Sequence, residues 1–319
     1  MKNMRNCPFC GQEKIEYLFD NHDRIYDNEE AFHICRCSAC KLIFVNPQPS
    51  PEELERYYPK KEYCSFRAQE NFFNRLGRFF NLMHYKCQDK WYGFLFLPLA
   101  PFLSYTEITR GGKVLDVGCG EGEFLARMKI LGMDVYGVEP NLDPAEVISP
   151  RAISLNIKKC FLEQAKFNDN FFDVIRLSHV FEHLPDPFST LIEARRILKP
   201  GGILIISLPT TDSALFKLFK KYWMPLDTPR HLFLFSSSLF YKIADKYDFK
   251  LKRIRFYLPP ALISSSIYFL IEKKIFKKNP IKDYGFFSYF FAIILLPIAY
   301  LFNFFKIGDC MEVFLQKRD

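Results

Sequence analysis

The stretch VLDVGCGEGEF, residues 114–124, decides the fold. An apolar run leads directly into a glycine-rich turn and then into residues with helical spacing. This order predicts a buried strand over 113–117, a tight turn and a helix over 123–131. Glycines in such a turn let main-chain amides approach a ligand closely at the carboxyl end of a sheet. The stretch therefore predicts a ligand-binding loop between a strand and a helix.

Downstream of this loop, strand and helix patterns alternate along the chain. Strands are expected over 135–139, 157–160, 172–177, 203–208, 251–257 and 311–316. Helices are expected over 187–198 and 237–247, with a less well-defined one around 144–153. Such alternation is typical of an α/β protein with a parallel sheet and crossover helices. The last two strands are expected to pair as an antiparallel edge.

The charges around the loop indicate which ligand it takes. The glycines at 118, 120 and 122 do not fit G-x-G-x-x-G, because the third glycine would fall at Glu123. Asp116, Glu121 and Glu123 also place negative charge where a pyrophosphate needs positive potential. Glu139 ends the second strand, where a carboxylate can accept hydrogen bonds from both ribose hydroxyls. A nucleoside with a ribose diol, a positive charge and no phosphate is S-adenosylmethionine.

Residues 107–257 resemble the class I S-adenosylmethionine-dependent methyltransferases. The matching motifs, in order along the chain, are LDVGCGEG at 115–122, VYGVEPN at 135–141, FFDVI at 171–175, HVFEHLPDP at 179–187 and LKPGG at 198–202. The whole chain is similar to the bacterial subgroup with an N-terminal zinc ribbon, often linked with cell-surface polysaccharide pathways. The resemblance implies a Rossmann-like, seven-stranded methyltransferase sheet and an S-adenosylmethionine-dependent methyltransferase.

The resemblance also implies a set of cofactor contacts, one group after each of the first four strands. Asp116 would hold the methionine ammonium through the loop, and Gly118, Cys119 and Gly120 would line that pocket. Glu139 would bind the ribose, and Phe161, Leu162 and Glu163 would lie beside adenine. Ser178 and His179 would lie near the sulfonium. The chain departs from the family pattern at Cys160, where relatives usually have glycine, and at Pro150, which interrupts the second helix.

Two histidines lie where the expected topology places the methyl acceptor. Methyl transfer from a sulfonium is a displacement, so a base is needed only when the acceptor is a hydroxyl or a protonated amine. His179 ends the fourth strand, and His231 lies in the loop after the fifth strand. His231 is either this base or a residue that fixes the loop through a backbone carbonyl. Arg230 either clamps an anionic group of the acceptor or pairs with Asp227, and His183 is expected to turn away as a capping residue.

Two Cys-x-x-Cys pairs near the start of the chain predict a metal site. Cys7 with Cys10, and Cys37 with Cys40, supply four thiolates for a closed, structural zinc ion. His33 and Cys35 are alternative ligands without the paired spacing. The stretch between the pairs carries acidic residues at 20, 23, 27, 29 and 30, which makes a nucleic-acid partner unexpected.

The expected organisation has four parts. They are a zinc-ribbon module at 1–50, a helical connector or cap at 51–106, a methyltransferase domain at 107–257 plus 309–319, and an apolar helical insertion at 258–308. The insertion has two charge-free runs around a lysine-rich segment at 273–282. Two interpretations remain open: a hairpin that dips into the inner face of the membrane, or a cap that packs on the protein or on a second subunit.

Composition narrows the class of protein. The chain has 319 residues, is 49% hydrophobic and 17% aromatic, and its charge balance is 44 − 36 = +8, which excludes a mainly disordered chain. No apolar signal core precedes the first cysteine, so a cytoplasmic protein, peripheral at the inner membrane, is expected. The leading hypothesis is methylation of a small or lipid-linked sugar acceptor in polysaccharide synthesis. The alternatives are RNA methylation and a non-enzymatic zinc-ribbon binding module.

Overall fold

The computed structural model describes residues 1–26, 28–58, 111–142, 155–275 and 295–319. Its larger sheet has seven strands, as the sequence predicts. Their spatial order is β10 (Phe249–Tyr257), β11 (Cys310–Lys317), β8 (Leu198–Pro209), β7 (Phe172–Ser178), β4 (Lys113–Val117), β5 (Asp134–Val138) and β6 (Asn156–Lys158). The strands from β8 to β6 are parallel, and β11 is antiparallel to both of its neighbours. This is the Rossmann-like, seven-stranded sheet that the resemblance implies, with β10 and β6 as its edge strands.

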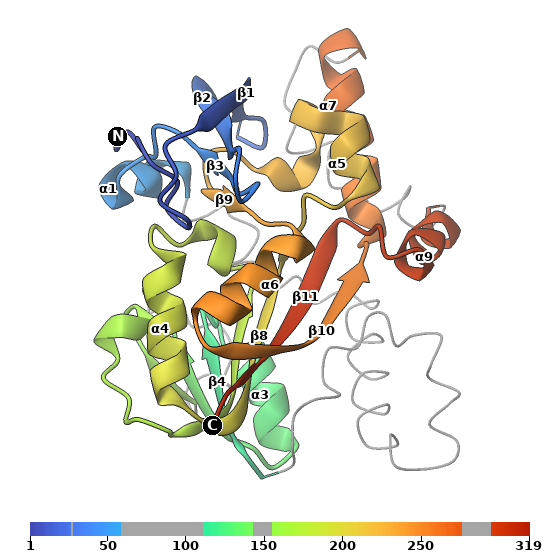
Figure 1. The fold of residues 1–319 in the computed structure, drawn as a ribbon. Helices are drawn as coiled ribbons and strands as arrows, with labels where there is room; N and C mark the ends of the chain where they lie inside the picture. Colours follow the sequence, from blue (N-terminus) through green and yellow to red (C-terminus); the bar gives the residue numbers. More distant parts are fainter. Residues whose placement is uncertain (27, 59–110, 143–154, 276–294) are drawn as a thin grey trace.

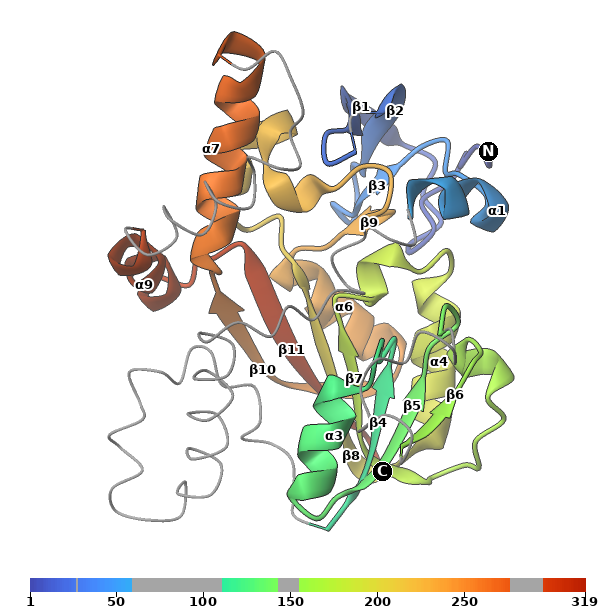
Figure 2. The same cartoon turned by 180° about the vertical axis from the view of Figure 1, so that it is seen from behind.

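Helices cover both faces of this sheet. In Figure 1, α4 (Pro187–Ile197) and α6 (Ser237–Lys246) lie in front of the sheet, and α3 (Glu123–Ile130) lies behind it; Figure 2 gives the reverse view. Helix α4 begins where Asp186 accepts hydrogen bonds from the amides of Phe188 and Ser189. Its apolar residues recur at helical spacing and are buried against the sheet. The predicted helices over 123–131, 187–198 and 237–247 are therefore confirmed.

Strand β8 is longer than the sequence predicts. The Lys199-Pro200-Gly201-Gly202 run stops α4, as expected, but it also forms the irregular start of β8. Leu198 pairs with Phe172 and Ile203 with Val174, so the run adds extra residues between two consecutive pairs. The ammonium of Lys199 lies 2.7 Å from the carboxylate of Asp173 on β7. A bulge and an ion pair thus let the strand begin early.

A smaller sheet holds the cysteine-rich module. Its strands are β1 (Ile15–Asp23), β2 (Asn28–Cys37), β3 (Ile43–Val45) and β9 (Phe233–Leu234). Strand β9 comes from the part of the chain that forms the larger sheet and pairs with β3, so the two parts share the smaller sheet. The ring of Phe9 also lies 5.4 Å from that of Phe188 on α4. Figure 1 shows the module at the end of the large sheet opposite the C-terminus, where the parallel strands end.

The insertion before β11 is partly packed on the protein. Helix α7 (Pro260–Ile275) contacts α5 (Ala214–Phe219) and buries Ile263, Tyr268 and Phe269. Helix α9 (Leu296–Phe304) buries Ala299 but leaves large apolar side chains exposed; they are Ile298, Leu301, Phe304 and the following Phe305. Among the described residues, no helix has the length and apolar character needed to span a bilayer.

Several expectations fall outside the described residues. They are the part of the connector at 59–106, the helix around 144–153 with Pro150, and most of the lysine-rich segment at 273–282. The connector begins with α1 (Pro51–Leu54) and the 3-10 turn η1 (Glu55–Tyr57), as its helical spacing predicts. Ser50 caps α1 in a reciprocal capping box with Glu53.

Candidate functional site

The glycine loop is held tightly against the second strand of the parallel sheet. The amides of Gly118 and Cys119 both donate to the carbonyl of Val138, at 2.8 and 3.2 Å. Gly118 has φ +68°, and a Cβ there would lie 2.4 Å from a methyl of Val180. Glycine is therefore required both by the backbone conformation and by the approach of the segment after β7. The loop and that segment form one continuous site.

Glu139 bridges the loop and the chain that follows β5. Its carboxylate accepts one hydrogen bond from the amide of Gly120, at 3.1 Å, and another from the amide of Asn141, at 3.0 Å. The side chain is only 7% exposed. A carboxylate has lone pairs for about four hydrogen bonds, so two remain for a ribose diol. The geometry fits the expected ribose contact.

Asp116 has a partner that the sequence interpretation missed. Its carboxylate lies 2.9 Å from the guanidinium of Arg176, at the paired position on β7. Burial raises the pKa of Asp116 to about 6, although Arg176 opposes that shift. The residue is 3% exposed, so its expected role at the ammonium, acting through the loop, stays a prediction. Any influence on a ligand passes through the loop that it supports.

The structural role of Arg176 could have been inferred from the sequence. This arginine is the one charged residue within the apolar run Val174–Leu177 of a strand that is expected to be central. A charge buried on a central strand needs a partner on the neighbouring strand, and Asp116 was available there. Arg176 also lies 4.3 Å over the ring of Phe124 at the start of α3. It thereby connects strand, loop and helix.

The expected adenine side is only partly open. Leu162, in the 3-10 turn η5 (Leu162–Gln164), is 2% exposed and packs in the core, and its expected place beside adenine stays a prediction. The carboxylate of Glu163 accepts a hydrogen bond from Thr190 on α4. Phe161 is 45% exposed and offers an aromatic face. Cys160 directly precedes this segment and is partly buried.

The buried thiol of Cys119 closes the loop from inside. A Cβ on Gly137 would lie 2.7 Å from its sulfur, so the thiol fills a gap that glycine leaves in β5. Burial raises the pKa of the thiol, which stays neutral. Ser178 ends β7 beside the loop and is partly buried.

Three histidines surround one buried carboxylate beyond Ser178. Glu182 lies in the 3-10 turn η6 (Phe181–His183) and is 0% exposed. Its Oε1 lies 3.4 Å from Nδ1 of His179 and 4.0 Å from Nε2 of His231. Burial opposes ionisation of Glu182, yet the surrounding imidazoles lower its pKa. His183 does not turn away as expected, because its ring lies 4.5 Å from that of His231.

The histidines differ in exposure and in partners. The side chain of His179 is 45% exposed, and its Nε2 lies 3.0 Å from the hydroxyl of Tyr257. The side chain of His231 is 10% exposed, and its Nδ1 lies 2.7 Å from the carbonyl of Pro225. The carbonyl contact that was one of two interpretations for His231 is therefore present. Its other nitrogen still faces Glu182.

Arg230 is not available to an acceptor. It is 0% exposed, and its guanidinium pairs with the carboxylates of Asp227 and Asp23, the latter at 2.6 Å. It also donates to the carbonyl of Tyr57 at 3.0 Å. The expectation of an acceptor clamp is wrong, and the alternative of a pair with Asp227 is confirmed. Asp23 is likewise an internal partner, so it does not add to an acidic surface.

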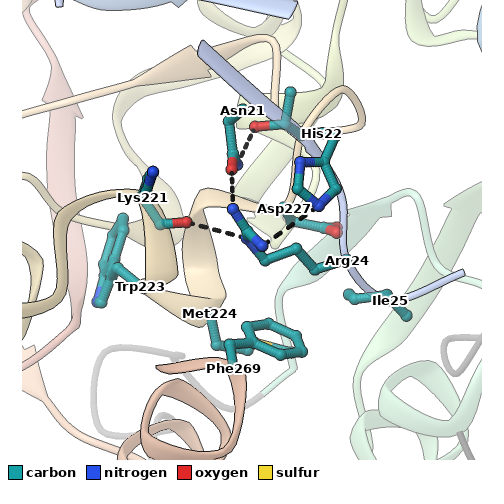
Figure 3. Close-up of a pocket in the computed structure, with 10 residues that line it drawn as sticks. Asn21, His22, Arg24, Ile25, Lys221, Trp223, Met224, Asp227 and Phe269 are labelled. Atoms are coloured by element: carbon teal, nitrogen blue, oxygen red, sulfur yellow. Dashed lines mark hydrogen bonds between the residues drawn. The ribbon is translucent and has the colours of Figure 1, made fainter. Parts of the chain in front are cut away.

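A small pocket lies where β1 meets the loop before His231 (Figure 3). Arg24 projects across it and donates to Asn21 and to the carbonyl of Lys221, each at 3.2 Å. Its guanidinium also lies 4.8 Å over the ring of Tyr222. None of the described residues of the glycine loop lines this pocket. Its contacts join the cysteine-rich module to the part of the chain that forms the larger sheet.

The four paired cysteines come together as predicted. Their sulfurs lie within 4.8 Å of one another, and Cys7–Cys40 and Cys10–Cys37 are each 3.5 Å apart. A tetrahedral zinc ion with bonds of about 2.3 Å would place its sulfurs about 3.8 Å apart. The group therefore fits a structural zinc ion. Of the two alternative ligands, Cys35 is buried outside this group and His33 pairs with Asp20.

A family model described as a methyltransferase domain matches residues 92–253, which is half of the chain. The chain belongs to this family. It is an S-adenosylmethionine-dependent methyltransferase of class I. The family match and the seven-stranded sheet agree on this family.

The comparisons with individual proteins cover different shares of this chain and of each relative. The ubiquinone biosynthesis O-methyltransferase of Vibrio atlanticus is 34% identical over 110 residues, which are 33% of this chain and 46% of that protein. The protein of the same name from Haemophilus ducreyi is 33% identical over 106 residues, 30% and 45% of the two chains. The chain thus spans less than half the length of these relatives. A Thermotoga maritima structure, described as a possible histamine N-methyltransferase, is 19% identical. The match covers 84% of this chain and 95% of that one, with a TM-score of 0.45.

Adding a methyl at Gly118 is expected to abolish cofactor binding by the methyltransferase. Gly118→Ala combines a left-handed backbone with a contact to Val180 that no Cβ tolerates. We expect it to cost about 2–4 kcal/mol of stability, from strain and overpacking together. Gly132→Ala is the matched control, because Gly132 has φ +83° but open space around it. It should cost about 1 kcal/mol and bind the cofactor normally. Equal losses in the two variants, measured by urea unfolding and calorimetry, would contradict the close approach.

Proposed function

We propose that this methyltransferase acts on a hydroxyl of a sugar or glycolipid intermediate of cell-surface polysaccharide synthesis. The observation that carries hydroxyl methylation is the imidazole–carboxylate group beside the cofactor loop. A hydroxyl must lose its proton during transfer, and a histidine oriented by a carboxylate is a suitable base. Methylation of a thioether or another proton-free acceptor would not need such a group. The curated relatives are named O-methyltransferases, which supports the same chemistry.

His179 is the residue that we assign to proton acceptance. It is the most exposed of the three histidines, and its Nδ1 faces Glu182 at 3.4 Å. Its Nε2 is within hydrogen-bonding distance of Tyr257 and could accept from an acceptor hydroxyl instead. When bound, S-adenosylmethionine supplies an electrophilic methyl group on sulfur. His179 would accept the proton that the acceptor oxygen loses, while the methyl group would pass from sulfur to that oxygen and leave its former bonding pair on sulfur.

The chain's own residues mainly align the reactants. Displacement at carbon requires the attacking oxygen in line with the leaving sulfur, and alignment alone can supply several kcal/mol of the barrier. Gly118 contacts Val180, which directly follows His179, so the loop packs against the segment that carries the proposed base. Glu139 holds Gly120 in the same loop. The cofactor and the base are thereby fixed against each other.

We also propose that the four paired cysteines hold zinc and that the ion is structural. Four thiolates leave no open coordination position, so the site would not activate water. Its contribution would be to hold the two Cys-x-x-Cys turns and β3, which pairs with β9, two residues after His231. The zinc module would in this way position the loop on the acceptor side.

The sugar or glycolipid class rests on the surface around α9. Leu301, Phe304 and Phe305 are 54%, 77% and 60% exposed, and the exposed Lys306 follows them. Apolar side chains beside a basic residue suit the boundary of an anionic lipid surface. An enzyme placed there would meet lipid-linked acceptors. The names of the curated relatives favour a second candidate, the acceptor of a ubiquinone-biosynthesis O-methyltransferase.

The acceptor class is tested with methyl-labelled S-adenosylmethionine and a lysate separated into RNA, protein, quinone and glycolipid pools. We expect the label in the glycolipid pool. His179→Gln should bind the cofactor as the wild type does but transfer at least about 100-fold less label. Label in the quinone pool would select the second candidate. Label in RNA alone would contradict the proposal.

Membrane contact is tested by replacing Leu301, Phe304 and Phe305 together with serine. Because these side chains are exposed, the fold should be unaffected. We expect the wild type to float with vesicles of phosphatidylglycerol and phosphatidylethanolamine, and the triple variant to stay with soluble protein. A variant at Tyr17 and Ile130, which are exposed far from α9 along the sequence, is the control. Equal flotation of all three proteins would refute a membrane role for α9.

A further inference from the structure

We propose that Glu182, His183 and His231 bind a divalent transition-metal ion on the acceptor side of the methyltransferase site. One potential ligand atom from each lies within 4.8 Å of the other two. Three atoms at this spacing are at most about 2.8 Å from a common centre, so coordination at about 2.0–2.2 Å needs only a small movement. Two imidazoles and one carboxylate on one side of an ion leave its other positions open.

The carboxylate of Glu182 is the first independent sign of a ligand. Neither of its oxygens has a hydrogen-bond partner among the described residues, although the side chain is 0% exposed. An ionised carboxylate without hydrogen bonds is costly to bury, and such groups are usually paired or coordinate metals. The nearest polar groups are the imidazole nitrogens of His179 and His231, at 3.4 and 4.0 Å. A cation among these groups would satisfy the carboxylate.

The orientation of the two imidazoles is the second sign. Nδ1 of His231 lies 2.7 Å from the carbonyl of Pro225, and Nδ1 of His183 lies 3.1 Å from the carbonyl of Arg230. A carbonyl oxygen only accepts, so each neutral imidazole carries its proton on Nδ1 and a lone pair on Nε2. The hydroxyl of Tyr58, 3.0 Å from Nδ1 of His183, then accepts from the same N–H. Metal-binding histidines are held in this way, by a backbone carbonyl on the nitrogen that does not bind the metal.

The backbone fixes the three side chains against one another. The amide of Leu232, next to His231, donates to the carbonyl of Glu182 at 2.9 Å. The buried Arg230 holds the other side of the loop through Asp227 and Asp23. A preformed scaffold of this kind is what precise metal coordination requires.

The position of the ion gives it a function and narrows the acceptor. It would lie beside His179, which follows β7 and contacts Glu182. An ion with open positions can hold two adjacent oxygens of an acceptor and lower the pKa of a bound hydroxyl. This role rests on the proposed hydroxyl methylation and implies an acceptor with neighbouring oxygens, such as a vicinal diol or a hydroxy acid. The binding of the ion itself does not depend on that function.

Metal binding is measured on zinc-loaded protein by titration with Mn²⁺, whose free ion is followed by electron paramagnetic resonance. Mn²⁺ prefers oxygen and nitrogen to thiolate ligands, so the cysteines should not compete. We expect one Mn²⁺ site in the wild type and in the control His33→Gln, whose histidine is exposed and pairs with Asp20. Glu182→Gln and His231→Gln should each weaken Mn²⁺ binding at least about tenfold. Loss of a residue that only supports a metal ligand already weakens metal binding by about 10–100-fold, so loss of a ligand should weaken it at least as much.

The melting temperatures of the metal-free proteins show whether Glu182 is a metal ligand or one partner of a structural ion pair. Glu182→Gln removes a buried charge without hydrogen bonds, so it should melt at the wild-type temperature or above. A lower melting temperature, together with Mn²⁺ binding that is absent or equal in all proteins, would overturn the site. His231→Gln supplies the same test if Glu182→Gln does not fold. Mn²⁺ binding without methyl transfer would refute the proposed function alone, and transfer without an Mn²⁺ site would refute this inference alone.

Discussion

Arg230→Met is expected to destabilise the protein by about 3–5 kcal/mol, because it leaves two internal carboxylates without their counter-ion. Asp23 is 1% exposed and Asp227 is 10% exposed, and both pair with the same guanidinium. Methionine fills a similar volume, so the loss reports on charge and hydrogen bonds rather than on a cavity. The free energy of unfolding in urea, measured on zinc-loaded protein, gives the value.

Two further variants define what the Arg230 experiment measures. Arg230→Lys keeps the charge but loses the planar guanidinium that binds two carboxylates at once. Its free energy of unfolding should therefore lie between those of the wild type and Arg230→Met. Arg195→Met is the control, because Arg195 pairs with Asp248 while the two side chains are 33% and 53% exposed. Its loss should stay below about 1 kcal/mol. A loss below about 1 kcal/mol for Arg230→Met as well would show that the buried pair does not hold the module and loop together.

Cys37→Ala is expected to remove zinc from the protein and to lower its stability by several kcal/mol. Structural zinc sites contribute about 10–16 kcal/mol of binding free energy in small zinc-finger peptides, so loss of one thiolate should release the ion. Cys35→Ala is the matched control, since Cys35 is also buried on β2 but lies outside the group of four. Metal analysis should find one zinc ion per chain in the wild type and in the control.

The two cysteine variants also test how the module affects the rest of the enzyme. Because β3 pairs with β9, loss of zinc should lower the melting temperature of the whole chain in one transition. Zinc content that is equal in Cys37→Ala and Cys35→Ala would contradict the metal site. Two separate melting transitions in the wild type would contradict the shared sheet.

The parallel part of the sheet could be predicted from sequence because its signals are local. The glycine loop, the strand before it and the helix after it are encoded within one short stretch, and β4 has the predicted bounds. The paired cysteines were equally informative, since a Cys-x-x-Cys turn places two sulfurs together without help from the rest of the chain. Their meeting required only that β1 and β2 form a hairpin.

The charged interior could not be predicted in full because its partners are distant in sequence. Arg230 and Asp23 are 207 positions apart, and only the packing of the module on the loop brings them together. Asp116 and Arg176 are 60 positions apart, but they share a register on neighbouring strands, so strand order would have paired them. His183 was assigned to a cap from its local sequence, whereas the loop before β9 sets its contacts.

The central claim is that the glycine loop and Glu139 together bind S-adenosylmethionine, and calorimetric titration of the zinc-loaded chain tests it most directly. We expect the wild type to bind the cofactor and Glu139→Gln to bind it at least about tenfold more weakly. The glutamine side chain would point its NH₂ group, a donor, at the backbone N–H of either Gly120 or Asn141, which is also a donor. Glu123→Gln removes the same charge from the end of the loop, where the side chain is 43% exposed, and should bind normally. Absence of binding by folded wild-type protein, or equal affinity in all three proteins, would contradict the account.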